Sequence, residues 1–218
     1  MVPDWTAACL ASDLPPGVVL RSDCAGVELA LWRSASGRVS AWRDRCQHRG
    51  MRLSHGFVRG ETLSCIYHGW VYGSDGGCRR IPAHPGLVPP AAIHADIFRA
   101  AEAGGLIWIA GEPAASPPAD LGLLHPVRSL LFACGAEHLL QGLPTTFHSV
   151  GQGVWQGTAP LPQPVMVTIA LQPLPDQTTM VHSVADSACP DQRVWLSRWL
   201  EGLRRETEAQ VGQAEAAA

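Results

Sequence analysis

Two short Cys/His pairs constrain this chain more than any other feature of its sequence. Cys46 and His48 are separated by one residue, and Cys65 and His68 by two; sixteen residues lie between His48 and Cys65. Two thiols and two imidazoles are ligands suited to a transition metal. The fold must therefore bring two separate loops together around one metal centre.

Two kinds of centre accept this donor set. A structural zinc ion takes two thiolates and two imidazoles in a closed tetrahedron. A [2Fe-2S] cluster of the two-histidine kind takes both thiolates on one iron and both imidazoles on the other, one Cys and one His from each loop. The single residue between Cys46 and His48 is short for a zinc site, and Gly50 and Gly69 let the backbone fold closely around inorganic sulfide. The spacing favours the cluster, with zinc and a chance coincidence as the alternatives.

The first half of the chain has the pattern of an antiparallel β structure. Apolar and polar residues alternate in short segments that are separated by Gly and Pro, which predicts a small sandwich or barrel over 17–112. The predicted strands are 18–21, 27–33, 39–42, 62–65, 70–72, 95–99 and 106–110. A short helix is predicted over 4–13, before Pro15.

The second half has a mixed pattern. An Ala/Ser/Pro-rich linker at 112–118 separates the two halves, so we expect domains at 1–115 and 116–218. Beyond the linker, helices are predicted over 129–142 and 191–214, and strands over 165–171 and 178–185. The expected fold class is α+β, mainly β.

Composition excludes several classes of protein. Sixteen arginines, with no lysine, face nineteen acidic residues, and a net charge of −3 does not suit nucleic-acid binding. No apolar run approaches eighteen residues and no leader pattern precedes Trp5, so we expect a cytoplasmic protein without a membrane span. Seven cysteines do not suggest a disulfide framework. We expect the five outside the motif to be small core residues: Cys9, Cys24, Cys78, Cys134 and Cys189.

The motif and its flanks resemble a known family. The segments Arg45-Cys-Gln-His-Arg-Gly50 and Cys65-Ile-Tyr-His-Gly-Trp70 are similar to the Rieske motif of the ring-hydroxylating, non-heme-iron oxygenases, as are 76–82 and 104–113. The resemblance covers about 5–115. It implies one [2Fe-2S] cluster held by Cys46, His48, Cys65 and His68, in a Rieske β-sandwich domain followed by a shortened oxygenase-like α+β domain.

The same resemblance implies a second, mononuclear iron site, which the sequence does not supply. The family carries two His and a bridging Asp on a helix after the Rieske domain, and the matching positions are Pro144, Ser149 and Gln141. The third ligand, an Asp on the last helix, corresponds to Thr207. These residues are poor ligands for Fe(II), so we do not expect that metal. A rearranged site built from Glu137, His138 and His148 is the alternative, while His182 is expected on the surface or in the core.

The sequence therefore predicts an electron-transfer protein of the oxygenase branch. It would accept electrons from a reductase or ferredoxin and pass them to a catalytic iron in a partner chain of a homo- or hetero-oligomer. Between Arg38 and Arg80, eight arginines face three acidic residues, a charge that would attract an acidic redox partner. The reduction potential is expected in the lower part of the Rieske range, roughly −150 to +300 mV. The alternative is a mono- or dioxygenase with an atypical iron site.

Overall fold

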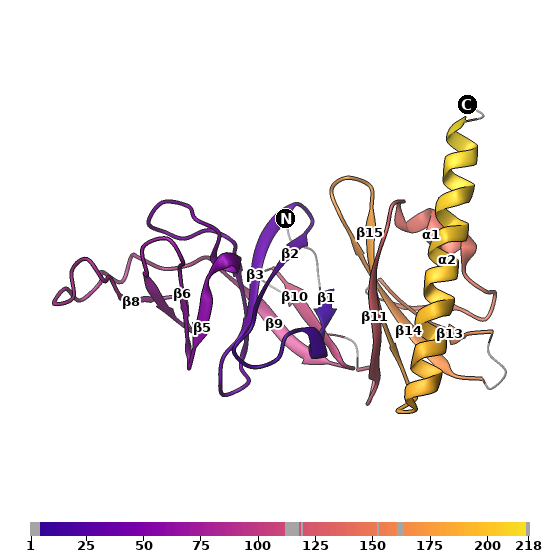
Figure 1. The fold of residues 1–218 in the computed structure, drawn as a ribbon, viewed down its shortest axis with the longest axis horizontal. Coiled ribbons are helices and arrows are strands. Elements are labelled where there is room, and N and C mark those ends of the chain that lie inside the picture. Colours follow the sequence, from indigo (N-terminus) through magenta and orange to yellow (C-terminus); the bar gives the residue numbers. More distant parts are fainter. Residues whose placement is uncertain (1–4, 112–117, 119, 152, 161–163, 217–218) are drawn as a thin grey trace.

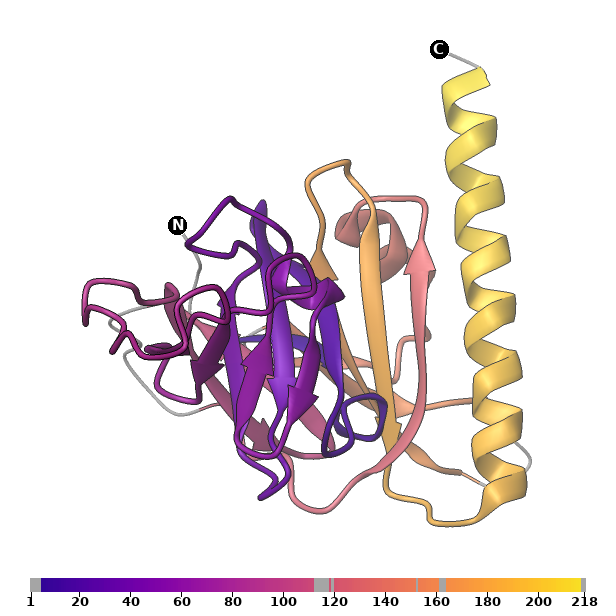
Figure 2. The same ribbon diagram turned by 60° about the vertical axis from the view of Figure 1, so that its left-hand side comes forward.

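Three antiparallel sheets follow one another along the long axis of the molecule (Figure 1). The computed structural model describes residues 5–111, 118, 120–151, 153–160 and 164–216. Helix α2 lies on the outer face of the third sheet, and its last turns extend beyond that sheet (Figure 2). The predicted mainly-β, α+β fold with antiparallel sheets is confirmed. The boundary predicted after residue 115 lies outside the described residues.

The first sheet has six strands in the order β1-β10-β9-β4-β3-β2. Its strands are β1 (Thr6–Leu10), β2 (Val19–Cys24), β3 (Val27–Arg33), β4 (Val39–Arg43), β9 (Ile97–Ala103) and β10 (Leu106–Ala110). The sheet is buried on both faces: on β3, Leu29 and Leu31 face one core, while Ala30 and Trp32 face the other. The two outermost strands curl toward each other, and the Ser22 hydroxyl donates a hydrogen bond to the Ala8 carbonyl at 3.4 Å.

The second sheet is small and carries the loop that contains Cys65. Its four strands are β5 (Phe57–Arg59), β6 (Thr62–Ser64), β7 (Val71–Gly73) and β8 (Cys78–Arg80). Leu63 and Tyr72 point from this sheet into the core that it shares with Trp32 and Trp42 of the first sheet. The two sheets together form the antiparallel sandwich that the sequence predicts over 17–112.

The third sheet has five strands in the order β11-β15-β14-β13-β12. Its elements are β11 (His125–Phe132), α1 (Ala136–Gly142), β12 (His148–Gly151), β13 (Val154–Thr158), β14 (Met166–Pro173), β15 (Thr179–Ala185) and α2 (Pro190–Ala216). On one face of the sheet, Ile169 and Val181 lie in a core with Leu200 of α2. On the opposite face, Ala170 and Val184 pack on β1 and β10. No helix in the described part of the chain is long and apolar enough to span a membrane.

Two predicted helices are wrong. Half of the helix expected over 4–13 is strand β1 (Thr6–Leu10), because these residues pair with β10, and only Ala11–Asp13 form a 3-10 turn. The helix expected over 129–142 is divided between β11, which pairs along its length with β15, and the short α1. In both segments the hydrogen bonds of a neighbouring strand override local propensity.

Helix α2 confirms the prediction over 191–214. Leu196, Leu200, Leu203 and Thr207 form its buried stripe. Trp195 lies off that stripe and is 50% exposed. Trp199 does contact the core, where its ring stacks on Phe147 with the centroids 5.8 Å apart.

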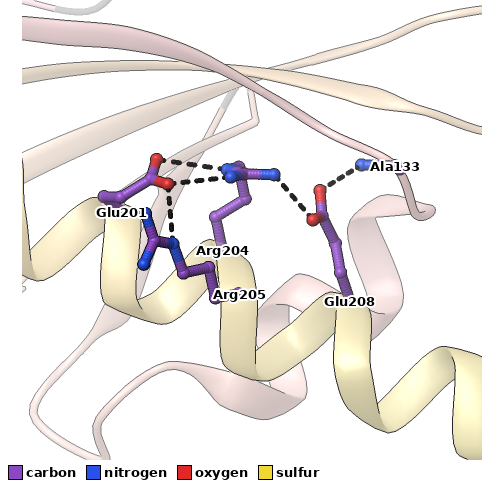
Figure 3. Close-up of polar contacts among 5 residues, drawn as sticks. All are labelled: Ala133, Glu201, Arg204, Arg205 and Glu208. Carbon is purple, nitrogen blue, oxygen red and sulfur yellow. Dashed lines mark hydrogen bonds and ion pairs between the residues drawn. The ribbon is translucent and has the colours of Figure 1, made fainter.

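A carboxylate of α2 ties the helix to the end of β11 (Figure 3). Glu208 accepts a hydrogen bond from the backbone N–H of Ala133 at 2.9 Å and one from Arg204 at 2.6 Å. Hydrogen bonds from Arg204 and Arg205 lower the pKa of Glu201 to about 2. The contribution of Glu201 to stability is therefore present above its ordinary pKa of 4.5 and is lost as the pH falls toward 2.

We expect Glu208→Ala to lower the free energy of unfolding by about 1 kcal/mol, because it removes a charged acceptor from a backbone N–H. Urea unfolding monitored by circular dichroism measures the change. Glu206→Ala is the matched control, since Glu206 is exposed on the same helix. Equal midpoints for the two variants would show that the contact with Ala133 does not stabilise the fold.

Candidate metal centre

The two predicted ligand loops share one backbone arrangement. In the first loop, the Cys46 N–H donates to Met51 O at 2.8 Å, and the Gly50 N–H donates to Cys46 O at 2.8 Å. In the second loop, the Cys65 N–H donates to Trp70 O at 2.9 Å, and the Gly69 N–H donates to Cys65 O at 3.1 Å. Each loop is thus a tight turn closed by its own cysteine.

Both turns need the conformational freedom of glycine. Gly50 has a φ of 70° and Gly69 a φ of 67°, in the left-handed region that a side chain disfavours. A Cβ on Gly69 would also lie 3.1 Å from Pro82 Cγ. The glycines that follow the two Cys/His pairs are therefore needed for the shape of the loops.

The loops bring the four predicted side chains together in two layers. Cys46 and Cys65 are buried, at 3% and 2% exposure, while His48 and His68 lie exposed at the surface above them. The two imidazole rings are 4.6 Å apart between centroids. His48 also stacks on Trp70 at 4.5 Å with an interplanar angle of 5°, which fixes the plane of that ring.

The electrostatics of this site follow from its layering. Burial raises the pKa of the Cys65 thiol, as does the neighbouring Cys46, while the backbone N–H groups of Tyr67 and His68 lower it. Partial desolvation, followed by the charges of His68 and Arg49, lowers the pKa of His48. A lowered pKa favours the neutral imidazole, which is the form that binds a metal.

A buried tyrosine supports the inner layer. The Tyr72 hydroxyl lies 3.2 Å from Cys46 Sγ, and Tyr72 packs edge-on against Trp42 with their rings 6.2 Å apart. Burial raises the pKa of Tyr72 above its ordinary value, so the hydroxyl keeps its proton. A metal-bound cysteine has no proton to give, and the hydroxyl would then donate to the sulfur. Tyr72 did not figure in the sequence prediction, although it lies only four residues after His68.

This donor set fits a [2Fe-2S] cluster. The cluster needs two thiolates for one iron and two imidazoles for the other, and the loops present a buried cysteine pair beneath an exposed histidine pair. Among the described residues, no group of three or more His, Cys, Asp or Glu side chains forms a single-ion site. Two pairs suit two metal ions that each take two protein ligands.

The sequence match agrees with this geometry. Residues 4–92 match the family of the Rieske [2Fe-2S] domain. The chain contains a Rieske domain. A [2Fe-2S] cluster is therefore supported by both the family and the arrangement of the donors, and the predicted resemblance is confirmed.

Curated relatives of the chain include an oxidoreductase and an oxygenase component. Oxidoreductase NdmD of Pseudomonas putida is 42% identical over 147 residues, which are 65% of this chain and 25% of that protein. The oxygenase component of chloroacetanilide N-alkylformylase from Rhizorhabdus wittichii is 36% identical over 140 residues, 62% of this chain and 39% of the relative. The chain thus spans well under half the length of these curated relatives.

The solved structures extend the likeness in fold beyond the Rieske domain. The structure of P. putida NdmA has a TM-score of 0.67 at 20% identity and covers 94% of this chain and 80% of NdmA. Dicamba monooxygenase has a TM-score of 0.69 at 21% identity, covering 99% of this chain and 89% of that enzyme. At these identities the likeness concerns the fold alone.

The residues aligned with the expected second iron site do not form a set of ligands. Gln141 and Ser149 are exposed, Pro144 lies in the loop between α1 and β12, and Thr207 is buried in α2. A Cβ added to Gly142 would lie 2.9 Å from Thr207 Oγ1, so α1 and α2 are in close contact there. A proline and two hydroxyls at the three ligand positions cannot replace two imidazoles and a carboxylate, and an amide stands at the position of the bridging Asp.

The alternative iron site is only partly assembled. His138 Nδ1 lies 3.5 Å from Glu137 Oε1, and both side chains are exposed on α1. His148 is on β12, where it pairs with Gln156 of β13. The structure thus brings Glu137 and His138 together and places His148 on a separate element.

Among the other cysteines, four of the five predicted core residues are buried, and Cys189 is exposed. His182 is in the core, with 2% exposure. Its role could not be predicted, because its hydrogen-bond partners, Ser129 and Gln172, are far from it in sequence or on another strand.

The hydroxyl of Tyr72 should raise the reduction potential, because a hydrogen bond to Cys46 stabilises the more negative, reduced state. We expect Tyr72→Phe to lower the potential by about 40 mV, which corresponds to roughly 1 kcal/mol for one electron. A spectroscopic redox titration measures it. Tyr67→Phe is the control, since Tyr67 is the only other tyrosine and is 58% exposed beside His68. Equal shifts in the two variants would contradict a role for the Tyr72 hydrogen bond.

Proposed function

We propose that the chain is a Rieske-type electron-transfer component in which Cys46 and Cys65 hold one iron and His48 and His68 hold the other. The observation that carries the proposal is the exposed imidazole pair, 4.6 Å apart, above two buried cysteines. When bound, a [2Fe-2S] cluster takes up and releases one electron. The Rieske domain would comprise residues 1–115 and the shortened oxygenase-like domain residues 116–218.

The exposed histidines provide the route for electrons. Their rings lie at the surface, so a partner can approach their outer edges. The cysteines beneath them are covered by Tyr72 and Trp42, which exclude water from the sulfurs. This layering supports a single exit and entry face in the cytoplasmic protein that we envisage.

Part of the positive charge between Arg38 and Arg80 is neutralised by ion pairs. Arg43, Arg52 and Arg79 are engaged by Asp96, Glu28 and Asp75, in that order. Within the described residues, Arg45 and Arg49 form no ion pair, and both are exposed on the loop of His48. These two arginines are the best candidates for docking an acidic reductase or ferredoxin.

We expect Arg49→Glu to raise the KM for an acidic ferredoxin several-fold at low salt while leaving the reduction potential within about 20 mV, because a rim charge mainly steers association. Stopped-flow reduction at two ionic strengths measures the effect. Arg59→Glu is the matched control, since Arg59 lies at the opposite end of β6 from Cys65. An equal loss in both variants would assign the effect to net charge and contradict local docking.

The acceptor in this proposal is a catalytic iron in another chain. The support is the absence of iron ligands at Pro144, Ser149 and Thr207. A homo- or hetero-oligomer with an oxygenase-type subunit would bring that iron to the face formed by His48 and His68. The names of the relatives, an oxidoreductase and an oxygenase component, are consistent with such an assembly.

The competing function is an oxygenase with its own atypical iron site. The name of the chloroacetanilide relative, an oxygenase component, favours it. Metal analysis distinguishes the two functions. Electron transfer alone predicts about two irons and two sulfides per chain, whereas an oxygenase adds a third iron that a mild chelator removes. Oxygen-dependent turnover by the pure chain would contradict the proposed function.

A further inference from the structure

A cavity of about 790 Å³ lies between β2 and the inner face of the third sheet. Its volume is within the range of small-molecule sites. Most of its wall is apolar, and the apolar lining residues are Ala8, Cys9, Leu20, Leu174, Pro175 and Met180. It lies on the face of the sheet opposite α1 and α2, away from the positions aligned with the second iron site.

A chain of hydrogen bonds ends in this cavity, and its direction is fixed at Gln172. The side-chain nitrogen of Gln172 lies within hydrogen-bonding distance of the Asp23 carbonyl oxygen and 3.1 Å from Ser22 Oγ. A carbonyl oxygen only accepts, so the nitrogen of the amide must face β2. The amide oxygen of Gln172 therefore faces His182, whose Nε2 is 3.0 Å away.

This orientation determines the proton on His182. Because Gln172 Oε1 only accepts, His182 Nε2 must carry the proton and donate it. Burial lowers the pKa of His182 to about 4, so at neutral pH the ring carries a single proton and its Nδ1 is an acceptor. The Ser129 hydroxyl, 2.8 Å from Nδ1, must then donate its only proton to the ring.

Ser129 is left with acceptor capacity alone. It lies directly opposite His182 across the β11–β15 pair, is half-buried, and lines the cavity. Its remaining lone pairs can accept a hydrogen bond from a molecule in the cavity, but its hydroxyl has no proton to offer to an acceptor. The site therefore selects for a ligand that donates.

The charged residues around the cavity disfavour negatively charged ligands. Asp13, Asp23, Glu28 and Asp176 line it, and the one basic lining residue, Arg21, is bound to Glu28 at 2.6 Å. The local charge is negative. A carboxylate or phosphate would be repelled, whereas a neutral hydroxyl or N–H group would not.

We propose that this cavity binds a small, mainly apolar molecule that carries a hydroxyl or N–H donor and no negative charge, with the donor received by Ser129 Oγ. The apolar wall would bury the apolar part of the ligand. The fixed direction of the hydrogen bonds from Gln172 through His182 to Ser129 would select a ligand that donates a hydrogen bond. An acceptor-only analogue would cover the Ser129 oxygen without donating a hydrogen bond to it, which is costly.

Three probes of one shape test the proposal on the full holoprotein: 4-ethylphenol, its methyl ether 4-ethylanisole, and 4-ethylbenzoate. Dissociation constants come from ligand-observed saturation-transfer NMR titrations. We expect saturable binding of the phenol at millimolar concentration or below, binding of the ether about tenfold weaker, and no saturable binding of the carboxylate. Ser129→Ala should weaken the binding of the phenol to the affinity of the ether, and it should leave the affinity for the ether unchanged.

Ser197→Ala is the matched control, because Ser197 is on α2, across the sheet from the cavity. It should leave all three probes unchanged. Equal affinity for phenol and ether, phenol binding that survives Ser129→Ala, or no saturable phenol binding would each overturn the proposal. None of these outcomes depends on electron transfer, so the two proposals fail separately.

Discussion

Replacing both His48 and His68 with cysteine should lower the reduction potential of the protein by about 250 mV or more. Two-histidine clusters have potentials above roughly −150 mV, whereas clusters with four thiolates lie near −400 mV, because two neutral ligands are exchanged for two negative ones. Both histidines are exposed on the ligand loops, so the replacement disturbs little of the core. A redox titration followed by visible absorption measures the shift, and iron and sulfide analysis establishes the cluster content.

His84→Cys provides the matched control for an added thiol, because His84 is exposed in a loop outside the two motifs. It should leave the potential and the metal content unchanged. Cys65→Ser provides a second line of evidence, since removing one buried thiolate should abolish most bound iron and sulfide. A double cysteine variant with the wild-type potential would show that the two imidazoles are not ligands.

The second large effect is a loss of stability in mild acid that depends on His182. Burial lowers its pKa to about 4 from an ordinary value of 6.5. Between these two pH values, His182 binds a proton in the unfolded chain but not in the native state. Stability is complete above pH 6.5 and falls as the pH drops toward 4. The expected loss is about 2 kcal/mol between pH 7 and pH 5 and about 3 kcal/mol in full.

Urea unfolding at pH 7 and pH 5 measures this dependence. His182→Gln should remove most of the difference between the two pH values, and His84→Gln, an exposed histidine, should keep the wild-type difference. Asp13, Arg21, Asp23 and Asp176 line the neighbouring cavity and are present in both variants, so the comparison cancels their titration. An unchanged pH dependence in His182→Gln would contradict the assignment.

Features built from neighbouring residues could be predicted from the sequence. Each candidate ligand loop is a tight turn of adjacent residues, so Cys46, His48 and Gly50 are recognisable as one motif. Strand β3 was also predicted from its own residues, although Leu29–Trp32 form a continuous buried run and not the half-buried alternation expected there. The same local information placed α2 within two residues of its observed bounds.

Features that depend on distant partners could not be predicted. Residues 6–10 become a strand because β10, about a hundred residues away, supplies their hydrogen bonds. The role of His182 depends on Ser129 and Gln172, which are separated from each other by β15 in the sheet. Cys46 and Tyr72 are only 26 residues apart in sequence, but their contact depends on the packing of β7 against the first ligand loop and could not be predicted from local sequence.

Pulsed electron paramagnetic resonance of the dithionite-reduced protein, combined with analysis of iron and acid-labile sulfide, identifies the ligands of the cluster. We expect two irons and two sulfides per chain and hyperfine coupling from two distinct imidazole nitrogens. The coupling from one nitrogen should be lost in His48→Cys and both couplings in the double variant. A colourless protein without sulfide, or a cluster signal without imidazole coupling, would contradict the proposed cluster.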